Sequence, residues 1–96
     1  MKDIAEIKVI TDEVVRRIET KTLFMCSIGH RGTVLIYNSR SNREVVGSVY
    51  FFDDMTTVYG RSVKARDTFY TEEAIGSAGY SDPDFFEKII NVVKGL

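Results

Sequence analysis

The stretch LFMCSIGHRGTVLIYNSRSNREVVGSVYFFDDMTTVYGRSVKAR, from Leu23 to Arg66, decides the fold. Four segments of it are rich in β-branched and aromatic residues, and short turn sequences with Gly, Ser, Asn or Asp separate them. These segments are residues 22–28, 33–38, 44–53 and 57–66. Because connections this short join antiparallel neighbours, the stretch predicts a four-stranded antiparallel meander.

Side chains alternate across a strand, so the residues of the meander sort into two faces. The predicted core face carries Phe24, Cys26, Ile28, Val34, Ile36, Val45, Val49, Phe51, Tyr59, Val63 and Ala65, together with Gly47. The second face carries Leu23, Met25, Ser27, Leu35, Tyr37, Glu44, Val46, Ser48, Tyr50, Phe52, Val58, Ser62, Lys64 and Arg66. A β-bulge at Gly47 or Gly60 would exchange the two assignments beyond it.

One helix is predicted before the meander in the sequence and another after it. Ile4, Ile7, Ile10, Val14, Val15 and Ile18 form one apolar stripe at helical spacing, although residues 4–10 also alternate as a strand would. The last segment has a broad apolar face from Phe85 to Leu96, and Ser81 or Asp82 can cap its start before Pro83. Two helices on the core face would leave the second face uncovered.

Residues 67–81 have no clean period, and Gly76-Ser77-Ala78-Gly79 predicts a flexible connection. An alternative is that this connection folds back over the second face, which Phe69, Tyr70, Ile75 and Tyr80 would then cover. Which of the two holds decides whether the second face is a binding surface or part of a second core.

The expected architecture is α+β, a single domain over residues 1–96 with both terminal helices on one face of a four-stranded antiparallel sheet. The order of its elements is similar to that of small folds such as frataxin-like domains and compact phage-encoded inhibitors. A frataxin-like domain has an acidic first helix, whereas the first helix here is charge-balanced. No family motif can be placed on this sequence residue by residue, so we assign no family.

The composition of the chain limits which partners and which cellular compartment we expect. The formal net charge is −1, so nonspecific attraction to nucleic acid or anionic lipid is not built into the chain as a whole. Basic residues concentrate in residues 30–66, which hold six basic and three acidic side chains. The single cysteine, the lack of a signal-peptide pattern and the lack of a long apolar run favour a cytoplasmic protein without a membrane partner.

No motif indicates a catalytic, metal or cofactor site. His30 and Cys26 are the only candidates for a nucleophile and its base, but a loop tip and a mid-strand position point in different directions. Asp53 and Asp54 are adjacent carboxylates that fit a turn better than a metal site. Gly76 and Gly79 lack the spacing of a phosphate-binding loop. We therefore predict a protein without enzymatic activity and without a cofactor.

The second face provides the functional hypothesis. Aromatic and apolar side chains with neighbouring basic residues are typical of protein interfaces. The predicted partner-binding residues are Leu35, Tyr37, Arg43, Tyr50, Phe52, Lys64 and Arg66. We expect a protein-protein interaction module, a small inhibitor or adaptor that also forms a homodimer. The alternative is a single-stranded nucleic-acid-binding protein that uses the same rings for stacking.

Overall fold

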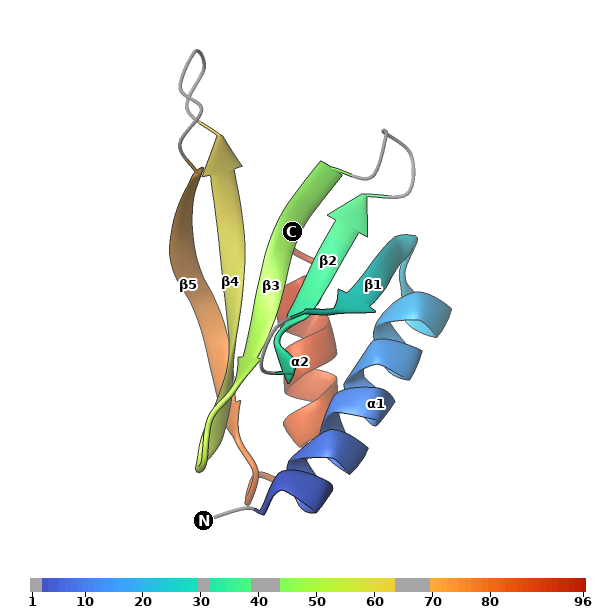
Figure 1. Cartoon of the computed structure of the whole chain (residues 1–96), viewed down its shortest axis with the longest axis vertical. Helices are drawn as coiled ribbons and strands as arrows, with labels where there is room; N and C mark the ends of the chain where they lie inside the picture. The colour runs from blue at the N-terminus through green and yellow to red at the C-terminus, as the bar shows by residue number, and fades with distance from the viewer. Residues whose placement is uncertain (1–2, 30–31, 39–43, 64–69) are drawn as a thin grey trace.

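The computed structural model describes residues 3–29, 32–38, 44–63 and 70–96. Its elements, in chain order, are α1 (Ile4–Lys21), β1 (Phe24–Ile28), β2 (Val34–Asn38), β3 (Glu44–Phe51), β4 (Met55–Val63), β5 (Tyr70–Gly79) and α2 (Phe85–Val93). The strands form one antiparallel sheet in the order β1-β2-β3-β4-β5, and α1 and α2 pack on one side of it (Figure 1). The α+β meander is confirmed, with five strands instead of four.

One hydrophobic core joins the sheet to both helices. Its fully buried side chains are Val14 and Ile18 of α1, Val34, Ile36, Val49 and Val58 of the sheet, and Ile89 and Val93 of α2. We call this side of the sheet the helix face and the opposite side the outer face. The apolar stripe of residues 4–18 therefore does form a helix, and the strand alternative for residues 4–10 is wrong.

Glycines on the helix face let α2 approach the sheet closely. A Cβ on Gly47 would lie 2.6 Å from the Tyr59 carbonyl oxygen and 2.8 Å from Leu96 Cδ1, and a Cβ on Gly76 would lie 2.6 Å from Val92 Cγ2. Real Cβ atoms do not approach this closely, so these strand positions accept only glycine without a backbone or side-chain shift. At these glycines, Val92 and Leu96 therefore pack against the backbone of the strands instead of against side chains.

The fifth strand is the main difference from the sequence prediction. Residues 70–79, expected to be a flexible connection or a cover for the second face, pair with β4 along its whole length. Glu, Ala, Gly and Ser are weak strand formers, so β5 shows little intrinsic strand signal. Gly76 and Ala78 lie on the helix face, where the nearby helix demands small side chains. Tertiary packing, not local propensity, accounts for this strand.

The faces of β4 are opposite to the prediction. Val58, expected on the second face, is fully buried in the core, whereas Tyr59, expected in the core, lies on the outer face. The β3–β4 connection is tighter than the sequence indicated, because the Phe52 N–H donates to the Met55 carbonyl at 2.8 Å. This turn pairs Phe51 with Thr56 and sets the register of the whole strand.

A bulge in β3 exchanges two more residues. Ile36 pairs with Gly47 and Tyr37 pairs with Val45, so Val46 is the extra residue. Val46, expected on the second face, packs against the core, and Val45 aligns with Tyr37 on the outer face. This bulge lies next to Gly47, one of the two positions where the sequence allowed a bulge to exchange the faces. Ile28, also expected in the core, is 56% exposed at the end of β1.

Helix α2 begins later than the sequence suggested. Asp84 occupies the N-cap position, and neither Ser81 nor Asp82 caps the helix. The Asp82 carboxylate instead accepts a hydrogen bond from the Gly79 N–H at 3.3 Å and pairs with Lys88 Nζ at 3.2 Å. These contacts fix the turn between β5 and α2 and thereby the position of α2 on the sheet.

Candidate functional site

The outer face is the leading candidate site because neither helix covers it. Apolar side chains stand exposed along it, among them Met25 at 52% and Phe52 at 44%. Leu35, Tyr37 and Tyr50 are half-buried beside them. The predicted alternative, in which residues 67–81 cover this face, is wrong for residues 70–81: β5 extends the sheet instead, and the Tyr80 ring packs on the buried Phe85, 5.3 Å between centroids. Residues 67–69, which include Phe69 of the predicted cover, lie outside the described residues.

Three aromatic rings form the centre of the outer face. The Tyr50 and Phe52 rings stack with their centroids 6.4 Å apart, and the Tyr59 ring meets Tyr50 edge-on at 4.9 Å. Such offset and edge-to-face pairs each add about 0.5–1.5 kcal/mol beyond burial of area. The rings therefore hold one another in place and present a preformed aromatic surface.

A single carboxylate anchors this aromatic cluster. Glu72 of β5 accepts hydrogen bonds from the Tyr50 hydroxyl at 3.1 Å and from Ser48 Oγ at 3.3 Å. Ser48 is 1% exposed although it lies on the outer face, since half-buried Leu35 and Tyr59 flank it in the sheet. Burial, and then the neighbouring Glu72, raises the pKa of the Tyr50 phenol. Tyr50 thus stays a neutral hydrogen-bond donor at physiological pH.

A smaller polar contact lies on the other half of the outer face. Ser27 Oγ donates to the Tyr37 hydroxyl at 3.1 Å, which joins β1 to β2. Met25 pairs with Tyr37 in the sheet register. This half combines thioether and aliphatic groups with one phenol, a composition suited to a protein partner.

The structure brings four of the seven predicted partner-binding residues together on one surface: Leu35, Tyr37, Tyr50 and Phe52. Arg43, Lys64 and Arg66 lie outside the described residues. Sequence reasoning missed Tyr59 and Glu72. A two-residue turn at Asp53-Asp54 would have placed Tyr59 on this face, but Glu72 had no usable signal because β5 itself was not recognised.

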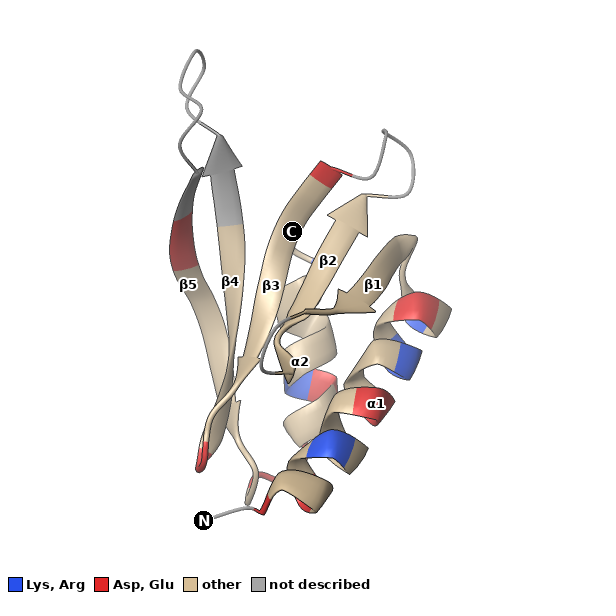
Figure 2. Ribbon diagram, in the orientation of Figure 1, with Lys and Arg blue, Asp and Glu red and all other residues tan. Residues whose placement is uncertain are grey.

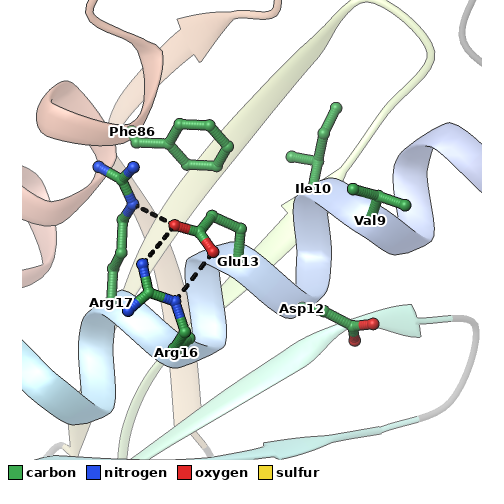
Figure 3. A pocket seen from close by; sticks show the side chains of 7 residues that line it. All are labelled: Val9, Ile10, Asp12, Glu13, Arg16, Arg17 and Phe86. Atoms are coloured by element: carbon green, nitrogen blue, oxygen red, sulfur yellow. Dashed lines mark hydrogen bonds and ion pairs between the residues drawn. The ribbon is translucent and has the colours of Figure 1, made fainter.

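A second surface lies where α1 meets α2, in a cavity of about 540 Å³ (Figure 3). The Glu13 carboxylate accepts from both Arg16 and Arg17, at 2.6 and 2.7 Å, and these hydrogen bonds lower the pKa of Glu13 to about 2. The Arg17 guanidinium lies 4.5 Å from the centroid of the Phe86 ring. Both arginines are paired with Glu13 within α1, and the contact of Arg17 with the Phe86 ring links this cluster to α2.

An apolar groove of about 490 Å³ runs between the first half of α1 and the sheet. Ile4, Ile7, Ile28 and Phe51 line it, with Lys8 at its rim. Ile4 is 88% exposed, so the start of the predicted apolar stripe is not part of the core. This groove is a separate apolar surface from the outer face.

Charged side chains are scarce on the described part of the sheet (Figure 2). Those the figure shows there are Glu44 at the start of β3 and the adjacent Glu72 and Glu73 of β5. Cys26 is half-buried, and burial raises the pKa of its thiol to about 12. His30, the candidate base for Cys26 that the predicted geometry did not favour, lies outside the described residues.

Two kinds of feature are absent from the described residues 3–29, 32–38, 44–63 and 70–96. No group of three or more His, Cys, Asp or Glu side chains there is placed to hold a metal ion. Neither helix in that part of the chain is long and apolar enough to cross a membrane.

Comparisons with protein-family models, with curated proteins and with solved structures found no match for this chain.

Proposed function

We propose that this chain is a non-enzymatic protein-binding module, a small inhibitor or adaptor whose docking surface is the outer face of the sheet. The observation that carries the proposal is the one-sided arrangement of the helices, which leaves Met25 and Phe52 exposed on the opposite side. Large exposed apolar patches in soluble domains commonly mark interaction surfaces.

The aromatic cluster supports the same proposal. Tyr50, Tyr59 and Phe52 are held by ring contacts and by the Glu72 hydrogen bond, so docking would immobilise few additional side chains. A preformed surface lowers the entropic cost of association. Tyrosine, phenylalanine and methionine are also the residue types enriched in interface centres.

The proposal is tested by capture of partners from a lysate of the source cells, followed by direct binding of the captured protein. Met25→Lys combined with Phe52→Lys removes exposed apolar surface from the outer face, and we expect most of the binding to be lost. Val9→Lys is the matched control, because Val9 is 69% exposed on α1 and its loss should leave binding unchanged. A partner that binds the double variant as well as the wild-type chain would refute this docking surface.

Single-stranded nucleic acid is the second candidate ligand, and the stacked Tyr50 and Phe52 rings are the observation in its favour. The Glu72 carboxylate beside these rings would repel phosphates, which makes this candidate the weaker one. Titration with a mixed-sequence single-stranded oligonucleotide at low salt tests it. Binding that weakens steeply as salt is added and is lost in Tyr50→Ala would support it, and undetectable binding at low salt would exclude it.

A further inference from the structure

The two edges of the sheet differ in accessibility. β1 has five residues, and at its free edge the Cys26 N–H donates to the Glu19 carboxylate of α1 at 3.4 Å. β5 has ten residues and, within the described part of the chain, pairs with β4 only. Free strand edges are templates for pairing with a further strand. Within the described residues, the β1 edge therefore carries a hydrogen bond to the protein's own helix, and the β5 edge has no further strand beside it.

We infer that the β5 edge pairs with β5 of a second copy of this chain, in an antiparallel arrangement that joins two sheets into one. Pairing of β5 with β1 of another copy would build an open chain of molecules, and Glu19 obstructs it. Pairing of β5 with β5 is two-fold symmetric and closes after two copies. The accessible edge thus selects a dimer.

The side-chain pattern of β5 selects a register for this dimer. Its pairing with β4 places Glu72, Ala74, Ser77 and Gly79 on the outer face and Glu73, Gly76 and Ala78 on the helix face. Ile75 is the extra residue at a bulge, and its Cγ2 would lie 3.4 Å from a Cβ on Gly60, so it also faces the helices. A two-fold axis between Ile75 and Gly76 keeps every facing pair on a common side of the joined sheet.

Acidic residues and a bulge at a strand edge normally hinder its pairing with another strand. In this register they do not hinder it. Glu72 faces Gly79 of the second copy and Glu73 faces Ala78, so the carboxylates do not oppose one another. Ala74 faces Ser77, and Ile75, which is 44% exposed in the single chain, faces Gly76 and gains cover there. Among registers that pair the whole of residues 72–79, only this one keeps the faces matched across the bulge, because any other places residues of opposite faces against each other.

The first test changes the charge of β5 and measures self-association by sedimentation velocity, over a range of protein concentrations up to high micromolar. The wild-type chain should show a monomer–dimer equilibrium. Ser77→Glu would bring a new carboxylate diagonal to Glu72 of the second copy and should weaken the dimer about tenfold, because the contact occurs twice. Ser77→Lys should strengthen it. Thr20→Glu, an equal charge change on the exposed surface of α1, should leave it unchanged.

A cross-linking test reads the register directly and does not depend on affinity changes. In a Cys26→Ser background, Ala74→Cys together with Ser77→Cys should give a covalent dimer on mild oxidation, since each cysteine would face one of the second copy. Ser77→Cys alone should give none, because the two copies of position 77 lie apart across the axis.

Three outcomes would overturn the inference: a strict monomer at every concentration, equal cross-linking by the single and double cysteine variants, or a dimer that resists Ser77→Glu. Loss of the dimer in Met25→Lys/Phe52→Lys but not in Ser77→Glu would place self-association on the outer face instead. The outer-face proposal and the β5-edge proposal can therefore fail independently.

Discussion

The helix face and the outer face of the same sheet are built on different principles. On the helix face, fully buried aliphatic side chains and strand glycines let α2 lie against the backbone. On the outer face, three rings contact one another, Tyr50 among them is hydrogen-bonded to Glu72, and several apolar side chains remain open to solvent. The close packing of the helix face supports stability, whereas the outer face leaves apolar surface exposed and available for binding.

The largest contrast is expected between neighbours in β2. Ile36 is fully buried on the helix face, so Ile36→Ala should lower the free energy of unfolding by about 2–5 kcal/mol. Leu35 is only half-buried on the outer face, and Leu35→Ala should cost about 1 kcal/mol. Urea denaturation of both variants measures the difference. Equal losses would mean that the outer face is as well packed as the core.

A smaller effect is expected at the strand glycines. Gly47→Ala would place a Cβ 2.6 Å from the Tyr59 carbonyl oxygen, and relief of this contact should cost about 1–3 kcal/mol of stability. Gly60 is the control, since its nearest neighbour would be Ile75 Cγ2 at 3.4 Å, so Gly60→Ala should be nearly neutral. Thermal and urea unfolding compare them. If Gly47→Ala proves as stable as Gly60→Ala, β3 and β4 do not need this close approach at Gly47.

The two faces of β1 should differ in thiol reactivity. The pKa of Cys26 is raised to about 12, so little thiolate exists near neutral pH and alkylation by iodoacetamide should be slow. Ser27→Cys in a Cys26→Ser background moves the thiol to the exposed neighbouring position and should react at least about tenfold faster. The rate for Cys26 should keep rising as pH increases toward 12. Equal rates at the two positions would contradict the burial of Cys26.

The smallest effect is expected for a hydroxyl of the outer face. Tyr50→Phe removes the hydrogen bond to Glu72 but keeps the ring contacts, so we expect a loss of about 1 kcal/mol or less on this partly exposed surface. Tyr37→Phe, which removes only the contact with Ser27, should cost less still. Chemical denaturation measures both losses. A larger loss at Tyr37 would show that the β1–β2 half, not the Glu72 cluster, organises the outer face.

Sequence patterns located most elements of this fold but not the faces of every strand. The stripes in α1 and α2 and the β-branched runs of β1 to β3 are strong signals, and the elements lie where these signals predict them. The predicted faces of Val58 and Tyr59 are the reverse of those observed, because the turn after Phe52 is shorter than the sequence predicts. In a period-2 pattern, an error of one residue moves every side chain beyond it to the other face.

For the candidate site, the sequence by itself determined which residue types could gather on one surface: Leu35, Tyr37, Tyr50 and Phe52 follow from alternation within β2 and β3. Only the tertiary structure added Tyr59 and Glu72 and opened the β5 edge. Alternation is a local property that a sequence records directly. The pairing of β5 instead depends on contacts with β4 and α2, since its small and acidic residues favour a strand only when these neighbours are in place.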